Sequence, residues 1–140
     1  MANAQTSGTS VDLPVASDAT AEQISNFNLD HHLVNLLLHE PFFSHVLRNV
    51  SKTKTSTIPT AGVTVRDGTF QLFWNPSFVA KLASLEVRGL LKHECYHLIF
   101  KHCTGRKQDP HMLWNWATDL AINSLIPESE LPEGGLRPGK

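Results

Sequence analysis

Apolar side chains recur at helical spacing in the stretch that begins near Asp30. Positions three and four apart share one face of a helix. The apolar residues that follow this spacing are Leu33, Leu36, Leu37, Phe43, Leu47 and Val50. Pro41 falls inside the run, where its ring and its missing N–H break a helix. The pattern therefore predicts two helical pieces that meet at Pro41.

A period of two follows in residues 63–66 and 69–74, on either side of Asp67-Gly68. Alternating strands around an Asp-Gly pair predict a tight β-hairpin. One face of this hairpin would carry Phe70, Leu72 and Trp74. An Asn-Pro pair at 75–76 then ends the second strand and leads into a short helix or turn. We expect the hairpin either to be a plain core sheet or to offer an edge strand to an extended peptide.

The longest helical pattern runs from Ser84 to Cys103 and contains no proline. Ser84 is the expected N-cap, and Gly105 follows as a stop signal. Much of this helix is apolar, with Leu90, Leu91, Leu98, Ile99 and Phe100. Gly89 either lets another backbone come close or is simply tolerated, and the second explanation is favoured.

A second helix is predicted from residue 110 to residue 126, between an N-cap at Asp109 and a stop at Pro127. Polar residues at intervals of four form a stripe along it, namely Asn115, Asp119 and Asn123. Buried polar side chains need hydrogen-bond partners, so another helix is expected to pack along this stripe. Helices combined with one hairpin indicate an α+β fold.

The composition narrows the class of protein. A chain of 140 residues suits one domain, which we place at residues 25–140, after a flexible tail at 1–24 that is rich in Ala, Ser, Thr and Asp. A net charge of −1 gives no reason to expect nucleic acid or an acidic membrane surface as a partner. Neither a signal segment nor a membrane-spanning apolar run occurs, so we expect a cytoplasmic location.

The two cysteines fit this location. Cys95 and Cys103 are eight residues apart in one predicted helix, about 12 Å along its axis and too far for a disulfide. Both are expected to be small buried apolar residues. Cys103 lies six residues after His97, where metzincins carry their third ligand, but Phe100 stands where their glycine would be. The metzincin alternative is therefore rejected.

Candidate chemistry lies inside the long helix, in the sequence His93-Glu94-Cys95-Tyr96-His97. Residues i and i+4 share a helix face, so one Zn²⁺ can take a nitrogen from each histidine. Glu94 would then be the general base that moves a proton from the activated water to the leaving amine. Tyr96 is expected to pack, with oxyanion stabilisation as the less favoured alternative. A helical bundle with accidental histidine spacing is also disfavoured.

Catalytic zinc usually takes three protein ligands and leaves one position for water. Asp119, in the middle of the second predicted helix, can approach His93 and His97 without distortion and is the favoured third ligand. Its alternative role is to orient a ligand imidazole. His111 and His102 stay open as other third ligands, although His102 is about 140° around the helix from His97. Four further histidines lack this spacing and are expected at the surface: His31, His32, His39 and His45.

Several segments together carry a family resemblance. They are Pro41-Phe42-Phe43, Pro59-Thr60-Ala61, residues 74–79 (WNPSFV), residues 90–97 (LLKHECYH), His102, Leu113-Trp114-Asn115 and residues 117–123 (ATDLAIN). Over about residues 33–136 the chain resembles a family of HExxH metallopeptidase domains of bacteria and phages, whose longer members carry a C-terminal von Willebrand factor A-like domain. The resemblance implies a zincin-like fold.

These observations predict a zinc-dependent metallopeptidase acting on a peptide or protein substrate. His93, His97 and Asp119 would hold Zn²⁺, and Glu94 would be the catalytic base. The alternative is a zinc-containing module without catalysis, which serves as an interaction or structural part of a phage or chaperone-linked assembly.

Overall fold

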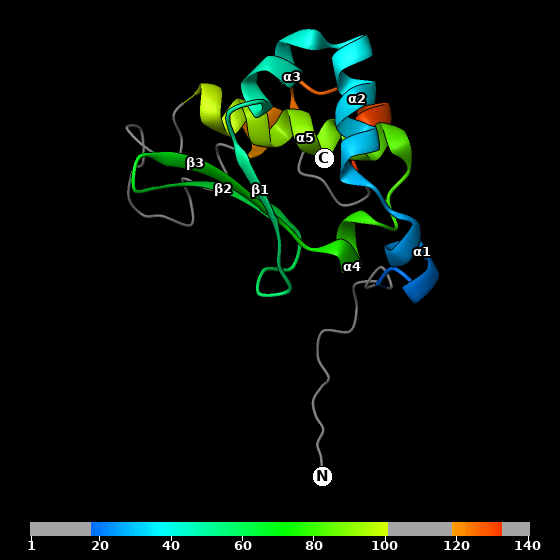
Figure 1. Ribbon diagram of the computed structural model, residues 1–140. Coiled ribbons are helices and arrows are strands. Elements are labelled where there is room, and N and C mark those ends of the chain that lie inside the picture. Colours follow the sequence, from blue (N-terminus) through cyan, green and yellow to red (C-terminus); the bar gives the residue numbers. More distant parts are fainter. Residues whose placement is uncertain (1–17, 101–118, 133–140) are drawn as a thin grey trace, which may run out of the picture.

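The computed structural model describes residues 18–100 and 119–132, and it has an α+β fold of helices around a small mixed sheet (Figure 1). In chain order the helices and strands are α1 (Ala21–Asn26), α2 (Leu29–His39), α3 (Pro41–Leu47), β1 (Ser51–Lys54), β2 (Ala61–Arg66), β3 (Thr69–Trp74), α4 (Pro76–Val79), α5 (Ser84–Ile99) and the 3₁₀ helix η2 (Glu128–Glu130). Residues 119–123 are also helical. The predicted fold class is confirmed.

The break at Pro41 occurs as predicted. Pro41 is the first residue of α3, where its missing N–H is not needed, and α2 ends just before it. The apolar faces of both helices turn inward, since Leu36, Phe43 and Leu47 are buried. The two-helix arrangement thus buries most of the stripe that the spacing indicated, with Leu33 partly buried and Leu37 exposed.

α1 begins inside residues 1–24, which the sequence predicts to be a flexible tail, and extends beyond them to Asn26. Thr20 Oγ1 accepts a hydrogen bond from the backbone N–H of Gln23, and the Gln23 side chain accepts one from Thr20 in return. This capping box starts the helix at Ala21. The backbone N–H of Ala19 donates to the carbonyl of Ser77 at 2.7 Å, which ties the start of the described chain to α4.

The predicted hairpin forms β2 and β3, which pair in antiparallel fashion with Val63 opposite Leu72. Both turn residues, Asp67 and Gly68, have positive φ (52° and 74°), as a two-residue hairpin turn of this kind requires. Leu72 and Trp74 are buried, whereas Phe70, near the turn, is 40% exposed. β1 adds to the other edge of β3 in parallel and was not predicted, because its sequence SKTK has no apolar alternation.

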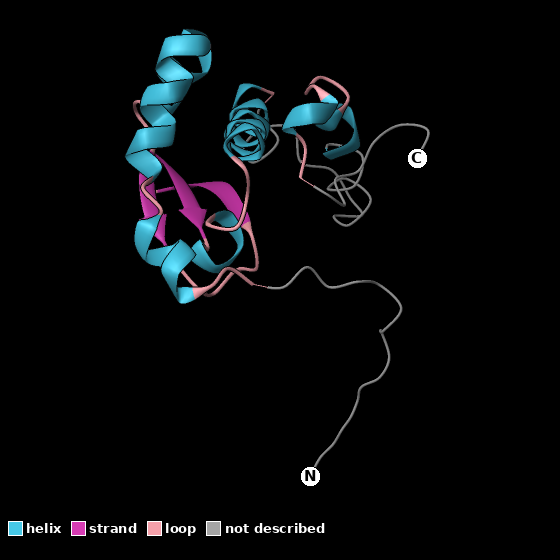
Figure 2. Ribbon diagram, turned by 90° about the vertical axis from the view of Figure 1, so that its right-hand side faces the viewer, coloured by secondary structure: helices cyan, strands magenta, loops and turns pink. Residues whose placement is uncertain are grey.

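α5 runs through the centre of the molecule. Figure 2 shows it almost end-on, with α2 and α3 on one side and residues 119–132 on the other. The core contacts of α5 come from Val87, Leu91 and Cys95. The helix begins at Ser84 as predicted, but its N-cap is Ala83, whose N–H donates to Glu86 Oε1 at 2.9 Å. The helix ends at Ile99 with Phe100 as its C-cap, so the predicted continuation was wrong at residue 100, and residues 101–103 lie outside the described part of the chain.

The second predicted helix also ends early. Residues 119–123 are helical, and the chain then tightens into a turn, with the N–H groups of Leu125 and Ile126 bonded to carbonyls three residues back. The Ser124 hydroxyl donates to the carbonyl of Ala121 at 2.6 Å, which competes with continued helix. The start of this helix lies outside the described residues.

No helix within residues 18–100 and 119–132 has the length and apolar character needed to cross a membrane.

Candidate metal centre

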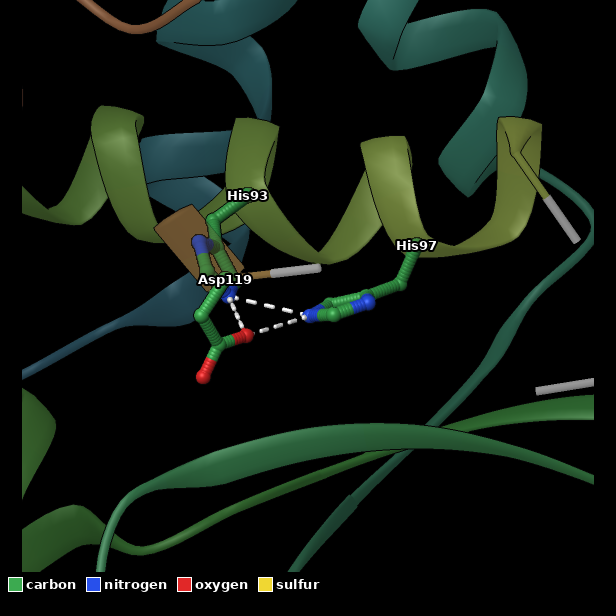
Figure 3. A group of neighbouring side chains, drawn as sticks. All are labelled: His93, His97 and Asp119. Carbon is green, nitrogen blue, oxygen red and sulfur yellow. Dashed lines mark hydrogen bonds and ion pairs between the residues drawn. The ribbon is translucent and has the colours of Figure 1, made fainter. Parts of the chain in front are cut away.

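Two imidazoles and one carboxylate converge on a single point beside α5 (Figure 3). His93 and His97 lie one turn apart on the helix, and their Nε2 atoms are 3.1 Å apart. Asp119 approaches from the helical segment after the undescribed residues, with its Oδ1 atom 3.1 Å from His97 Nε2 and 3.3 Å from His93 Nε2. The three atoms form a nearly equilateral triangle.

The size of this triangle fits a metal ion. In a tetrahedral zinc site with bonds of about 2.0–2.1 Å, the ligand atoms are about 3.3–3.4 Å apart. The observed edges of 3.1, 3.1 and 3.3 Å are close to that separation. The histidine side chains are 17% and 18% exposed and that of Asp119 is 38% exposed. A small ion can therefore reach all three donors.

Asn123 holds the far side of the His93 ring. His93 Nδ1 and Asn123 Oδ1 are 2.8 Å apart, and Asn123 is buried. Since the amide oxygen only accepts, this contact places the proton on Nδ1 and leaves the Nε2 lone pair directed at the triangle. Asp119 and Asn123 are one helical turn apart, so both members of the polar stripe that the structure describes find partners on α5.

The pKa shifts of Asp119 and His93 show how the cluster distributes charge. Burial opposes ionisation of Asp119, but the hydrogen bonds to His93 and His97 outweigh it and hold the pKa of this carboxyl well below its ordinary value. Burial also lowers the pKa of His93, yet the hydrogen bond to Asp119 and the charge of Glu94 raise it overall. Asp119 therefore stays ionised, and its negative charge favours a cation, either a proton or a metal ion, at the two Nε2 atoms.

Glu94 lies on the inner side of α5 and is 4% exposed. It faces a small apolar cavity between the helix and the sheet, which is lined by Leu72, Trp74 and Leu91 among others. Burial raises the pKa of Glu94 above its usual value, while the neighbouring histidines oppose this shift. Its carboxylate is therefore next to the triangle but not part of it.

Comparison with known proteins adds the family. Residues 26–135 match the family described as "Putative metallopeptidase domain". The chain belongs to this family. It is also 29% identical, over 99 residues, to an uncharacterized protein of Thermotoga maritima, a match that covers 69% of this chain and 25% of that protein. The search of solved structures gave no match.

Membership of this metallopeptidase family agrees with the predicted cluster. The structure brings together His93, His97 and Asp119, which are the residues predicted as ligands, and their binding of zinc stays a prediction. The alternative third ligands, His102 and His111, lie outside the described residues, as does Cys103, which was expected to be a buried apolar residue. Tyr96 packs between aromatic rings, with ring centres 5.4 Å from Phe43 and 5.7 Å from Phe100.

Of the histidines expected at the surface, His31, His39 and His45 are exposed. His32 is only half-exposed, because its ring stacks on Phe27 at 5.0 Å.

Two contacts around the cluster were missed. The Asn123 contact with His93 was signalled by the polar stripe, but spacing alone could not assign its partner. Gly89 was expected to be merely tolerated, and this was wrong: a Cβ atom there would lie only 1.7 Å from the carbonyl oxygen of Glu130. Another backbone therefore crosses α5 at that glycine.

Proposed function

We propose that the chain is a zinc-dependent peptidase domain in which His93, His97 and Asp119 hold the metal and Glu94 is the general base. The observation that carries the proposal is the triangle of two Nε2 atoms and one Oδ1 atom, with edges of 3.1–3.3 Å. The metallopeptidase family supports a peptide or protein as substrate. The proposed domain covers residues 25–140, in keeping with the family match to residues 26–135.

Glu94 and Asn123 would have different roles in the reaction. When bound, zinc would supply the Lewis acidity that activates a water molecule and polarises the scissile carbonyl. Glu94 follows His93 directly, and its carboxylate would accept a proton from the attacking water and donate it to the leaving amine nitrogen. Asn123 keeps His93 in one tautomer and one orientation.

A route for substrate binding follows from the sheet. β2 lies at one edge of the sheet, contacts α5, and pairs only with β3 among the described residues. An extended peptide that added to β2 through backbone hydrogen bonds would run beside the metal centre. This placement would bring the scissile bond to Glu94 without a deep pocket.

The burial of Glu94 favours a second candidate function. A carboxylate that is 4% exposed leaves little room for a reacting water, so a zinc-containing interaction module without catalysis is the alternative. Both candidates predict bound zinc, and turnover separates them.

The experiment compares wild type with Glu94→Gln in zinc analysis and in cleavage of a peptide library. We expect both proteins to hold about one zinc ion per chain, and we expect the variant to lose at least about 100-fold in kcat/KM, because a general base contributes about 10²–10⁴-fold. Glu22→Gln, which changes an exposed glutamate on α1, is the matched control.

Three outcomes would count against this proposal. Equal cleavage by Glu94→Gln would remove Glu94 from the mechanism. Zinc binding by the wild type without any cleavage would favour the interaction module. Absence of zinc from protein resupplied with the metal would overturn both candidates.

A further inference from the structure

A buried ionic contact joins α5 to the chain segment that carries Asp119. Lys92 Nζ lies 2.7 Å from Glu130 Oε1 and 3.0 Å from Glu40 Oε2. Arg88 Nη1 lies 3.6 Å from the other carboxylate oxygen of Glu130. Lys92 and Glu130 are both 5% exposed, so this pair is shielded from water. Lys92 directly precedes His93 in α5, and Glu130 is eleven residues after Asp119, so this contact joins the two segments that carry the metal centre.

Gly89 completes this contact by allowing the backbone to approach. A Cβ atom at residue 89 would meet the carbonyl oxygen of Glu130 at 1.7 Å and its carbonyl carbon at 2.6 Å. The main chain of η2 therefore packs directly against α5 at Gly89. Glycine is the only residue type that leaves room for this contact, because it has no Cβ atom. We call Gly89, Lys92 and Glu130 the anchor, and residues 119–130 the ligand segment.

The ligand segment is fixed to α5 at two places. Near its start, Asp119 and Asn123 contact the two histidines, and at its end Glu130 occupies the anchor. Between them Ile122 and Ile126 are buried. Because apolar packing is non-directional, the isoleucines alone would tolerate a shift of the segment along α5. The anchor does not, since a shift would separate a buried carboxylate from its ammonium partner.

A buried ion pair is a poor source of stability, because removing two charges from water offsets most of their attraction. Its better-attested use is to specify one register among similar packings. We propose that the anchor is a positioning device that sets Asp119 at bonding distance from His93 and His97, and so sets the affinity of the centre for a divalent metal. This inference rests on the proposed metal-binding function.

The test uses the full chain with Gly89→Ala and Glu130→Gln, and measures Zn²⁺ affinity by competition with a chelator. Alanine favours helix and carries no charge, so Gly89→Ala displaces the ligand segment without weakening α5 itself. Glu130→Gln keeps the side-chain length and removes the charge. We expect each variant to lose about 10–100-fold in affinity, as for other residues that orient metal ligands. Gly62→Ala, with nothing within 4 Å of the added atom, is the matched control.

A double-mutant cycle separates positioning from general destabilisation. If the anchor acts through Asp119, Gly89→Ala should cause less than about a twofold further loss of affinity when Asp119 is already replaced by asparagine. The same loss in both backgrounds would overturn the proposal, as would wild-type affinity in Gly89→Ala and Glu130→Gln. Failure of both variants to fold would also overturn it, because the anchor would then serve stability alone.

A metal-free measurement keeps this proposal distinct from the proposed function. The imidazole ¹⁵N signals of His93 and His97 report the tautomer and hydrogen bonds of each ring without metal. We expect Gly89→Ala to change them and Gly62→Ala to leave them as in wild type. If wild type binds no zinc, the proposed function fails, and with it the effect of the anchor on metal affinity. The positioning of Asp119 by the anchor is then tested by the ring signals alone, and unchanged signals in Gly89→Ala would refute it.

Discussion

Asp119 is the residue on which the chemistry of the metal centre depends most, because it alone brings negative charge to the triangle. We predict that Asp119→Asn lowers Zn²⁺ affinity by more than about 100-fold, since a ligand is lost rather than an orienting group. Chelator competition measures this loss, and Asp18→Asn, at an exposed aspartate near α1, is the control. A smaller loss would assign Asp119 the role of orienting a histidine, with the third ligand elsewhere.

A second prediction at this scale concerns His32 and pH. Burial, together with the neighbouring His31, lowers the pKa of His32 from its ordinary value of 6.5. The unfolded chain therefore binds this proton more readily than the folded chain, and stability is present above pH about 6.5 and falls as the pH drops through the lower folded-state pKa. We expect His32→Gln to reduce the difference in urea midpoint between pH 7.5 and pH 5.5.

His45→Gln, at an exposed histidine of α3, is the control for this measurement. An unchanged pH dependence in His32→Gln would assign the acid sensitivity to other groups.

The sequence predicted some of the side-chain contacts at and near the metal centre, but not all of them. The spacing of His93 and His97 fixes them on one helix face, and the interval of four between Asp119 and Asn123 fixes another pair. Lys92 and Glu130 gave no such signal, because a buried ion pair between distant segments depends on how those segments pack. Gly89 shows the same limit: a glycine in a helix reads as tolerated until the crossing backbone is known.

The β2–β3 hairpin depends mainly on residues close together in the sequence, above all on the two residues of its turn. Gly68 has a φ of 74°, a conformation that costs other residues about 1–2 kcal/mol. We predict that Gly68→Ala lowers the free energy of unfolding by about that amount in urea titrations. Gly62→Ala, within β2 of the same hairpin, should not lower it. Equal effects of the two substitutions would contradict a role for the turn conformation.

β1, α1 and the early end of the helix at residues 119–123 were not predicted, because none of them depends on apolar periodicity. β1 has the polar sequence SKTK and exists because β3 offers it a free edge, which is a tertiary effect. α1 is six residues long and depends on the capping box at Thr20 rather than on an apolar stripe. The early end of the helix at residues 119–123 reflects a competing bond from Ser124, which outweighs the apolar periodicity.

In the molecule as a whole, α5 separates two kinds of packing. One side contributes Val87, Leu91 and Cys95 to the apolar core, and the other carries the anchor and the metal centre. The class α+β followed from the sequence, but the strand order β1-β3-β2 did not, because periodicity does not say which strands are neighbours. The position of the centre between α5 and a later segment likewise needed the fold.

The burial of Cys95 has a consequence for labelling experiments. Its side chain is fully buried, its Sγ atom lies 3.7 Å from the carbonyl oxygen of Phe43, and burial raises the pKa of the thiol to about 12. A thiol reagent can thus modify Cys95 only when α5 moves away from α3. In a chain with Cys103 replaced by serine, the rate of modification therefore measures how often the core next to Glu94 opens.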